Sequence, residues 1–307
     1  MTLEANRREF LQTLFVGAAG MSLTWPAYGQ PRTPAPIMAT KLTDRIAIFA
    51  GAGGNVGLVI GPAGLMMIDG GLANRAKELA QAIAMMNKRR VEVLFNTHYH
   101  GDHVGSNEHL GKDKLQILAH ENVKTRLGQR IESTAFGRTL EPLSAVGLPT
   151  KTFTTGGKFA VGPEALEFTH VPMAHTDGDA YVFFPGANVL HTGDLLFIGR
   201  YPVVDFTVGG SLAGMAAALE KMDGVGDAKT QIIPGHGPLT TKDEMRATRE
   251  MWGTINERLE AMAKQGRSVD EAVKEVPTKD FDAKINVTNP ERFVRQAYGG
   301  VLAGQGR

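Results

Sequence analysis

One short segment, residues 96–106, brings three imidazoles and a carboxylate together within six residues. Its sequence is NTHYHGDHVGS, and the four side chains are His98, His100, Asp102 and His103. On an extended strand the first three would share one face and His103 would lie on the other, whereas a tight turn can divide the four into two groups. Clustered imidazoles repel one another when charged, and the commonest use of neutral imidazole beside carboxylate is metal binding. The alternative is a chance cluster on a solvated loop.

Short apolar runs of β-type composition recur along the chain, and the His-rich segment follows one of them. Between several of these runs, apolar residues recur at helical spacing. We therefore expect strands at 45–49, 56–60, 65–68, 91–95, 115–119, 166–171, 180–184, 188–190 and 231–233, and helices at 74–87, 121–130 and 211–222. The loop AGAGG at 50–54 is expected to be a hairpin loop. It is not a phosphate cradle, because a strand follows it where such a cradle needs a helix.

Two parts of the chain do not fit the strand pattern. Residues 131–155 are irregular and contain several glycines and prolines, and long irregular stretches in compact domains tend to be functional or mobile. Residues 243–307 are mostly helical, with a capping box from Ser268 to Glu271 and a helix start at Asn289. We see no chemistry in this C-terminal part and expect it to serve packing or dimerisation.

Further candidate ligands follow other predicted strands. His175 lies in a loop after a strand, Asp194 again follows a strand, and His236 lies in the sequence Pro-Gly-His-Gly. The chain contains no cysteine, which excludes disulfides, a thiolate nucleophile and any zinc site built on sulfur. Any metal must therefore be held by nitrogen and oxygen.

The N-terminal region has the pattern of an export signal. Paired arginines, Arg7 and Arg8, precede an apolar stretch, and small residues at 27–29 follow at the usual cleavage spacing. We interpret residues 1–29 as a twin-arginine-type signal peptide, with an ordinary secretory signal as the alternative. The apolar stretch is too short, and too interrupted by glycine, to span a membrane.

This interpretation predicts a mature chain that begins near Gln30, a linker over 30–40 and a periplasmic location. It also predicts the twin-arginine translocase as a partner during export and no stable membrane anchor afterwards. Because that route carries folded proteins, often with a metal or cofactor loaded, the signal itself indicates a bound group. Charge indicates no further partner: 33 basic and 32 acidic residues give a formal net charge of +1, and no basic stripe points to nucleic acid.

The ordered set of motifs resembles the metallo-β-lactamase superfamily from about Arg45 to Leu239. The resemblance rests on His-x-His-x-Asp-His at 98–103, His175, Thr-Gly-Asp ending at Asp194, Pro-Gly-His-Gly around His236 and Ile-Asp-Gly-Gly at 68–71. It implies an α/β fold, a four-layer αβ/βα sandwich over 41–242 with a helical C-terminal extension over 243–307.

The same resemblance implies a two-zinc centre with an aspartate bridge, as in glyoxalase II-like members. The ligands would be His98, His100 and His175 for one zinc, Asp102, His103 and His236 for the other, and Asp194 for both. The implied reaction is hydrolysis of an acyl bond by a hydroxide shared between the metals. Asp102 would be both a ligand and the catalytic group that orients the water or shuttles its proton.

Other polar residues near these motifs are expected to be structural. Asp69 is expected to orient the His-rich loop, and the turn carboxylates of Asp177 and Asp179 to bond the local backbone. Seven ligands already supply both metals, so the remaining four histidines are expected to be structural or solvated. They are His109, His120, His170 and His191.

The substrate is less constrained than the metal centre. Cysteine-bearing β-lactamases of the superfamily have Cys where this chain has Asp194, and many have a lysine three positions later, where this chain has Phe197. The nearest cation is Arg200. We expect a small-molecule acyl substrate, with β-lactams first because a β-lactamase works in the periplasm, and lactones or thioesters next. An iron-dependent redox enzyme and a non-catalytic binding protein of the same fold are the alternatives from other classes, and the oligomeric state is open.

Overall fold

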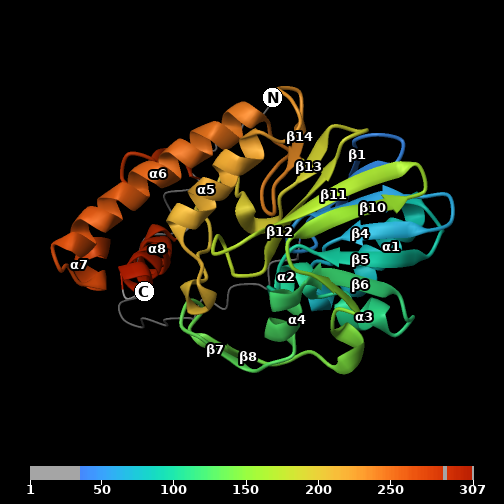
Figure 1. The fold of residues 1–307 in the computed structure, drawn as a ribbon, viewed down its shortest axis with the longest axis horizontal. Coiled ribbons are helices and arrows are strands. Elements are labelled where there is room, and N and C mark those ends of the chain that lie inside the picture. Colours follow the sequence, from blue (N-terminus) through green and yellow to red (C-terminus); the bar gives the residue numbers. More distant parts are fainter. Residues whose placement is uncertain (1–34, 286–288, 306–307) are drawn as a thin grey trace, which may run out of the picture. The chain divides into compact units, whose positions relative to one another are not determined.

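The computed structural model of the chain describes residues 35–285 and 289–305. The predicted signal peptide and the first part of the predicted linker lie outside the described residues. Within the described ranges, no helix combines the length and the apolar character needed to cross a membrane. In this part of the chain the strands form two large sheets and one two-stranded hairpin, and eight α-helices accompany them (Figure 1).

The first sheet has seven strands in the order β1-β2-β3-β4-β5-β6-β9. Neighbouring strands are antiparallel from β1 to β4 and parallel from β4 to β9. The strands are β1 (Met38–Lys41), β2 (Ile46–Ala50), β3 (Val56–Ile60), β4 (Leu65–Ile68), β5 (Val91–Asn96), β6 (Gln116–His120) and β9 (Lys151–Phe153). The parallel strands β4, β5 and β6 all end at the same edge, so the loops that follow β4 and β5 lie close together.

The second sheet has five strands in the order β10-β11-β12-β13-β14, antiparallel except for the last pair. The strands are β10 (Gly156–Val161), β11 (Glu164–Val171), β12 (Asp179–Phe184), β13 (Val189–His191) and β14 (Gln231–Ile233), and the separate hairpin is β7 (Ile131–Ser133) with β8 (Arg138–Leu140). The helices are α1 (Ala76–Met86), α2 (Gly101–Val104), α3 (Asn107–Gly111), α4 (Glu121–Leu127), α5 (Leu212–Asp223), α6 (Lys242–Lys264), α7 (Val269–Lys274) and α8 (Pro290–Gln305). Every strand and helix predicted from apolar periodicity is present, with ends shifted by three residues or fewer.

The two sheets pack face to face because both faces of their strands are apolar. Successive residues of a strand point to opposite faces. Ile46 of β2 therefore packs between the sheets, whereas its neighbour Ala47 packs in the layer that includes α1. In β12, Val182 packs between the sheets and Tyr181 packs in the layer that includes α5 and α6. The chain thus forms the predicted four-layer αβ/βα sandwich.

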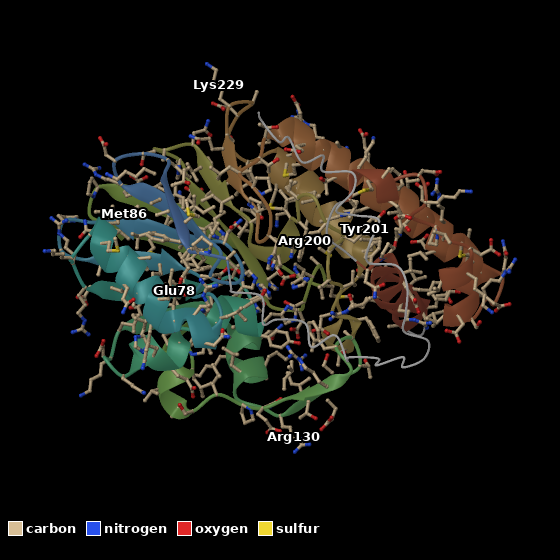
Figure 2. The ribbon with its side chains drawn as sticks, turned by 180° about the vertical axis from the view of Figure 1, so that it is seen from behind. Glu78, Met86, Arg130, Arg200, Tyr201 and Lys229 are labelled. Carbon is tan, nitrogen blue, oxygen red and sulfur yellow. The ribbon has the colours of Figure 1, made fainter. Side chains whose placement is uncertain are left out.

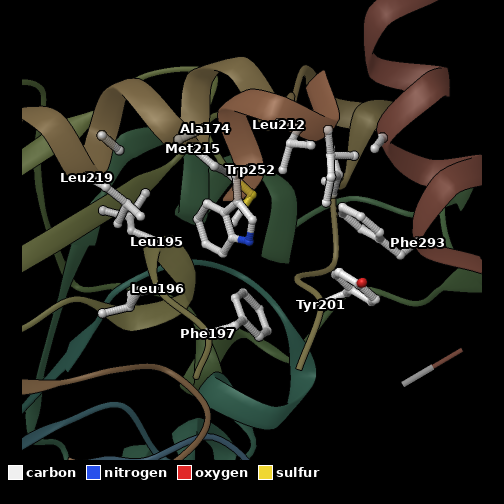
Figure 3. Close-up of a cluster of buried hydrophobic side chains, with 14 of the residues drawn as sticks. Ala174, Leu195, Leu196, Phe197, Tyr201, Leu212, Met215, Leu219, Trp252 and Phe293 are labelled. Atoms are coloured by element: carbon white, nitrogen blue, oxygen red, sulfur yellow. The ribbon is translucent and has the colours of Figure 1, made fainter. Parts of the chain in front are cut away.

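A third apolar layer covers the outer face of the second sheet, under α5, α6 and α8 (Figure 1). The fully buried indole of Trp252 in α6 lies among side chains of α5 and of the loop that follows β13 (Figure 3). The ring of Tyr201 stacks on Phe293 of α8, with centroids 4.6 Å apart. The C-terminal helices therefore share one core with α5 and are not an independent unit.

Two differences from the sequence prediction concern short strands. The structure begins β1 inside the predicted linker, and the four residues of this strand are exposed and pair with β2. The stretch predicted to be irregular contains β7, β8 and β9, each of three residues. A strand of three residues is too short to show an alternation of apolar and polar residues, and a strand whose residues are all exposed has no buried face to produce one. Periodicity could therefore not reveal these strands.

Lys242 ties the start of α6 to the end of α5. Its side chain is buried, and its Nζ donates to the carbonyl oxygens of Met222, Asp223 and Val225 at 2.9, 2.7 and 2.6 Å. These include last-turn carbonyls of α5 that no later residue of the helix can satisfy. We expect Lys242→Met to lower the free energy of unfolding by about 2–3 kcal/mol, measured by urea denaturation.

The control for this substitution is Lys221→Met, because Lys221 is exposed on α5. Its expected effect is within about 0.5 kcal/mol of zero. Equal losses in the two variants would show that the buried ammonium does not anchor the helices.

Candidate metal centre

A tight turn divides the four polar side chains of the His-rich segment. The chain leaves β5 at Asn96, bends at residues 97–99, is extended at His100, and then enters the four-residue helix α2, which carries Asp102 and His103. The carbonyl of His100 accepts from the backbone N–H of His103 at 2.9 Å, which closes the turn. The side chains therefore fall into two groups, as one of the two sequence interpretations requires.

The first group gathers donor atoms from four residues: His98, His100, His175 and Asp194, each offering one atom within 4.8 Å of the others. All four residues are buried. His175 lies in the loop between β11 and β12, and its Nε2 is 2.8 Å from Nδ1 of His100 and 3.4 Å from an oxygen of Asp194. Nε2 of His98 is 3.8 Å from the same carboxylate.

The second group consists of Asp102, His103 and His236, again with donor atoms within 4.8 Å of one another. Nε2 of His236 is 3.2 Å from Asp102 and 3.4 Å from Nε2 of His103. The carboxylate of Asp194 reaches this group as well, since it is 3.0 Å from His103 and 3.4 Å from His236. Asp194 therefore lies between the two groups. All seven residues predicted as ligands are in these groups.

The protons on the imidazoles point away from the centre of each group. Asp205 accepts from Nε2 of His100 at 2.9 Å, the carbonyl of Val203 accepts from Nδ1 of His175 at 2.7 Å, and Asp69 accepts from Nδ1 of His103 at 2.8 Å. In neutral imidazoles the other ring nitrogen is then a lone pair. These assignments leave two lone pairs facing each other 2.8 Å apart between His100 and His175. A cation between the facing nitrogens removes this repulsion.

Burial and charge also favour a cation. Burial lowers the pKa of His98 below its usual range and that of His175 to about 4. Both rings are therefore neutral, and each can offer a nitrogen lone pair to a cation. Nε2 of His98 is buried without a hydrogen-bond partner among the described residues. In the second group burial opposes a charged ring, yet Asp194 and Asp102 raise the pKa of His236 to about 9. The residues present therefore fit metal ions.

Asp69 orients the His-rich loop, as predicted. One carboxylate oxygen accepts from the backbone N–H of Thr97 at 2.8 Å, and the other accepts from the hydroxyl of Thr97 and from His103, both at 2.8 Å. Through these bonds Asp69 fixes the ring of His103 with Nε2 toward His236. A partner on the outer nitrogen is the usual way in which proteins fix a metal-binding imidazole.

Asp205 does the same for His100, and sequence reasoning missed it. Its carboxylate accepts from Nε2 of His100 and from the hydroxyl of Tyr99. Asp205 is buried and lies 105 positions after His100, in a segment without a recognisable motif. Only the folded chain brings the two together.

We expect Asp205→Asn to weaken metal binding by the first group about 10–100-fold, because the amide no longer fixes the tautomer of His100. Competition with a chelator of known affinity measures the loss. Asp243→Asn, which changes an exposed carboxylate on α6, is the control. Equal affinities in the two variants would contradict the orienting role.

The four histidines that were predicted to be structural lie outside both groups. His120 caps α4, since its Nδ1 accepts from the N–H of Asn122 at 3.2 Å, and the ring of His170 stacks on it at 3.7 Å. His191 is buried, and its Nδ1 accepts from Gly193 N–H at 3.2 Å, whereas His109 lies in the last turn of α3. The carboxylate of Asp179 bonds the local backbone as predicted, since it accepts from two backbone N–H groups. The carboxylate of Asp177 differs from the prediction, since it pairs with Arg126 at 2.6 Å.

A cavity of about 1010 Å³ opens onto both groups and is lined by His100, Asp102, Asp194 and His236. Its walls come from the turn after β4, the β7–β8 hairpin, the loop after β13 and helix α8. The packing role expected for the C-terminal part is present, since α8 packs in the core, and α8 in addition forms a wall of the cavity, which the sequence did not predict. The loop at 51–55 borders the site as well, and it leaves no room for a side chain at Gly54, where a Cβ would lie 2.2 Å from the ring of His103.

The fold and site define a mixed α/β sandwich with a His/Asp metal-binding cluster between the loops of its two sheets. Residues 50–236 match the family model of the Metallo-beta-lactamase superfamily, and the chain belongs to this superfamily of metallo-hydrolases. It is 27% identical over 207 residues to a hydroxyacylglutathione hydrolase of Nitrosococcus oceani. The aligned residues make up 67% of this chain and 70% of the relative.

A second relative, the hydroxyacylglutathione hydrolase of Gloeobacter violaceus, is 29% identical over 124 residues, 40% of this chain and 42% of its own length. Among solved structures, a metallo-beta-lactamase from Pontibacter korlensis superposes with a TM-score of 0.60 at 21% identity, over 71% of this chain and 99% of its own. This structural likeness establishes the fold alone.

Proposed function

We propose that the chain is an exported, zinc-dependent hydrolase of acyl bonds that binds two zinc ions, and that thioesters are its preferred substrates. One observation carries the proposal: two convergent groups of His and Asp donors share Asp194 and open onto one cavity. When bound, a zinc pair acidifies water and polarises an acyl carbonyl. The seven ligands are those named above: His98, His100 and His175, Asp102, His103 and His236, with Asp194 between the groups.

Two observations favour thioesters over the β-lactams that the sequence placed first. The relative that aligns over two thirds of this chain is named a hydroxyacylglutathione hydrolase, which acts on a thioester by its name. In addition, Phe197 is buried against the ring of His236, with centroids 5.2 Å apart, so the position where a lysine would meet a drug carboxylate is an apolar wall.

The roles of the chain's own carboxylates differ with their exposure. The side chain of Asp194 is 4% exposed and is enclosed by imidazoles, which suits a ligand that does not move. The side chain of Asp102 is 32% exposed and faces the cavity. Its Oδ2, 3.2 Å from His236, faces the donor group, and the other oxygen of the carboxylate would be free to hold a proton of the attacking water and pass it to the departing thiolate.

The test combines metal analysis with a substrate panel. Purified protein is assayed on S-lactoylglutathione, a γ-lactone and nitrocefin, before and after treatment with a chelator. We expect two zinc ions per chain and thioester hydrolysis that is lost on chelation and restored by zinc. Iron in place of zinc would support a redox enzyme instead, and zinc-loaded protein that cleaves no substrate of the panel would remove the hydrolase proposal.

Export is tested separately. We expect the full chain to reach the periplasm and the variant with Arg7→Lys and Arg8→Lys to stay in the cytoplasm, because the paired arginines are the part of the signal that the twin-arginine translocase reads. Cell fractionation measures both. Export of the double-lysine variant at the normal level would indicate an ordinary secretory signal.

A further inference from the structure

The cavity is strongly cationic outside the metal-ligand groups. Three arginines line it, and they come from three separate parts of the chain: Arg138 from β8, Arg200 from the loop after β13 and Arg292 from the first turn of α8. The carboxylates that line it are those of Asp102 and Asp194, which belong to the metal centre. Among the residues that the structure describes, no other acidic side chain of the cavity wall is therefore left to balance the three guanidinium groups.

None of these three guanidinium groups forms an ion pair or donates a hydrogen bond within the described residues. Other arginines in the same part of the chain do so: Arg130 pairs with Glu132 at 2.9 Å and Arg258 with Asp280 at 2.6 Å. Figure 2 shows Arg200 toward the middle of the molecule and Arg130 at its outer edge. A guanidinium has five N–H donors that fit carboxylate or phosphate, so the cavity holds several such sites without a partner.

Phe136 connects two of the arginines to the metal centre. The guanidinium carbons of Arg138 and Arg292 lie 5.6 and 5.9 Å from the centre of its ring, within the range of a cation–π contact. The same ring packs edge-to-face against His100, with centroids 4.9 Å apart and an interplanar angle of 87°. One phenyl ring therefore separates the two arginines from a ligand of the first metal group.

The turn that carries Phe136 is held from two sides. Nε2 of the buried Gln296 in α8 donates to the carbonyl oxygen of Ala135 at 2.7 Å, and the hydroxyl of Thr207 accepts from the N–H of the same residue at 3.0 Å. Helix α8 thus supplies Arg292 and also fixes the hairpin turn that precedes Arg138. Preorganisation of this kind reduces the ordering cost of binding a ligand.

We propose that Arg138 and Arg292, which come from separate parts of the chain and both contact the ring of Phe136, form an anion clamp that binds a doubly negative part of the substrate remote from its acyl bond. The clamp deepens the proposed function and rests on it, since it assigns the acyl hydrolase a dianionic substrate class. Two carboxylates or one phosphate monoester supply this charge. Arg200 lines the same cavity and adds to the attraction. Such contacts persist unchanged from bound substrate to transition state, so they act on KM and not on kcat.

The test measures KM and kcat of zinc-loaded protein and of the variants Arg138→Gln, Arg292→Gln and both together. S-lactoylglutathione carries two carboxylates, its diethyl ester carries none, and S-lactoyl phosphopantetheine carries a phosphate. For an anionic substrate we expect KM to rise about tenfold in each single variant and about 100-fold in the double variant, with kcat unchanged. The diethyl ester should show no such dependence. Whichever anionic substrate responds more strongly identifies the anion, and a response to either supports the clamp.

The matched control is Arg130→Gln, which changes an arginine beside the same hairpin that is paired with Glu132 and lies outside the cavity. Arg138 and Arg292 are both exposed, so their variants should fold, and equal melting temperatures verify this. An unchanged KM in the double variant, or an equal rise in KM for the diethyl ester or in the Arg130 variant, would overturn the clamp.

A binding experiment separates the clamp from the hydrolase proposal. Calorimetry measures the affinity of S-hexylglutathione, a thioether that cannot be hydrolysed, for the zinc-loaded wild type and the double variant. Binding that weakens about 100-fold in the double variant supports the clamp even if no thioester is cleaved, and only the proposed function would then fail. Hydrolysis of the thioesters with no weakening of thioether binding would overturn the clamp and leave the proposed function intact.

Discussion

Replacing Asp194 with alanine is expected to reduce bound zinc from two ions per chain to one and to lower kcat/KM at least about 10³-fold. The physical reason is the position of its carboxylate, which lies 3.4 Å from His175 of the first group and 3.0 Å from His103 of the second. Without it, each group keeps only its own donors, and no anionic side chain holds the two metal ions together. Plasma mass spectrometry of the purified variant gives the zinc content, and thioester hydrolysis gives the rate.

Asp177→Ala is the matched control for Asp194→Ala. Asp177 is also an aspartate in a loop near His175, but its carboxylate pairs with Arg126 and belongs to neither donor group. Its substitution should leave two zinc ions in place and change the rate less than about threefold, as for a partly exposed ion pair. Two zinc ions in the Asp194 variant would show that this residue does not bridge the groups.

The largest expected effect on stability comes from Trp252→Ala, at about 4 kcal/mol of unfolding free energy. Trp252 is fully buried in the layer between the second sheet and the C-terminal helices (Figure 3). Its removal leaves a cavity that the surrounding side chains of α5 and α8 cannot fill without moving. Urea denaturation monitored by circular dichroism measures the loss.

Trp252→Phe separates packing from hydrogen bonding. The indole Nε1 is buried without a hydrogen-bond partner among the described residues, so phenylalanine removes volume but no hydrogen bond. We expect a loss of less than about 2 kcal/mol. A loss in Trp252→Phe equal to that in Trp252→Ala would contradict a purely packing role for this side chain.

The residues of the two donor groups could be predicted because each follows a strand, in a short motif. His98 and His100 follow β5, His175 follows β11 and His236 follows β14. Each strand is an apolar run whose length and composition are readable from the chain, and strand ends at one edge of a sandwich converge. The positions of the longer strands could be predicted from these apolar runs, whereas the four-layer arrangement was implied by the resemblance to the superfamily.

The residues around the centre could not be predicted in the same way. Asp205 supports His100 and accepts from the hydroxyl of Tyr99, but Asp205 stands in no motif, and its contact with Tyr99 spans 106 positions. The part played by α8 was missed because its sequence shows a good amphipathic helix. The same residues that predict packing, such as Phe293, also line the cavity. Sequence periodicity predicts which face of a helix is buried. It does not predict that the same helix borders a cavity.

The central claim is that two metal ions lie in the two donor groups and share Asp194. Anomalous diffraction at the zinc edge from crystals of the exported protein tests it most directly. The account predicts two peaks per chain: one among His98, His100 and His175, and the other among Asp102, His103 and His236, with Asp194 in contact with both. A single peak, no peak, or two peaks that Asp194 does not join would contradict it.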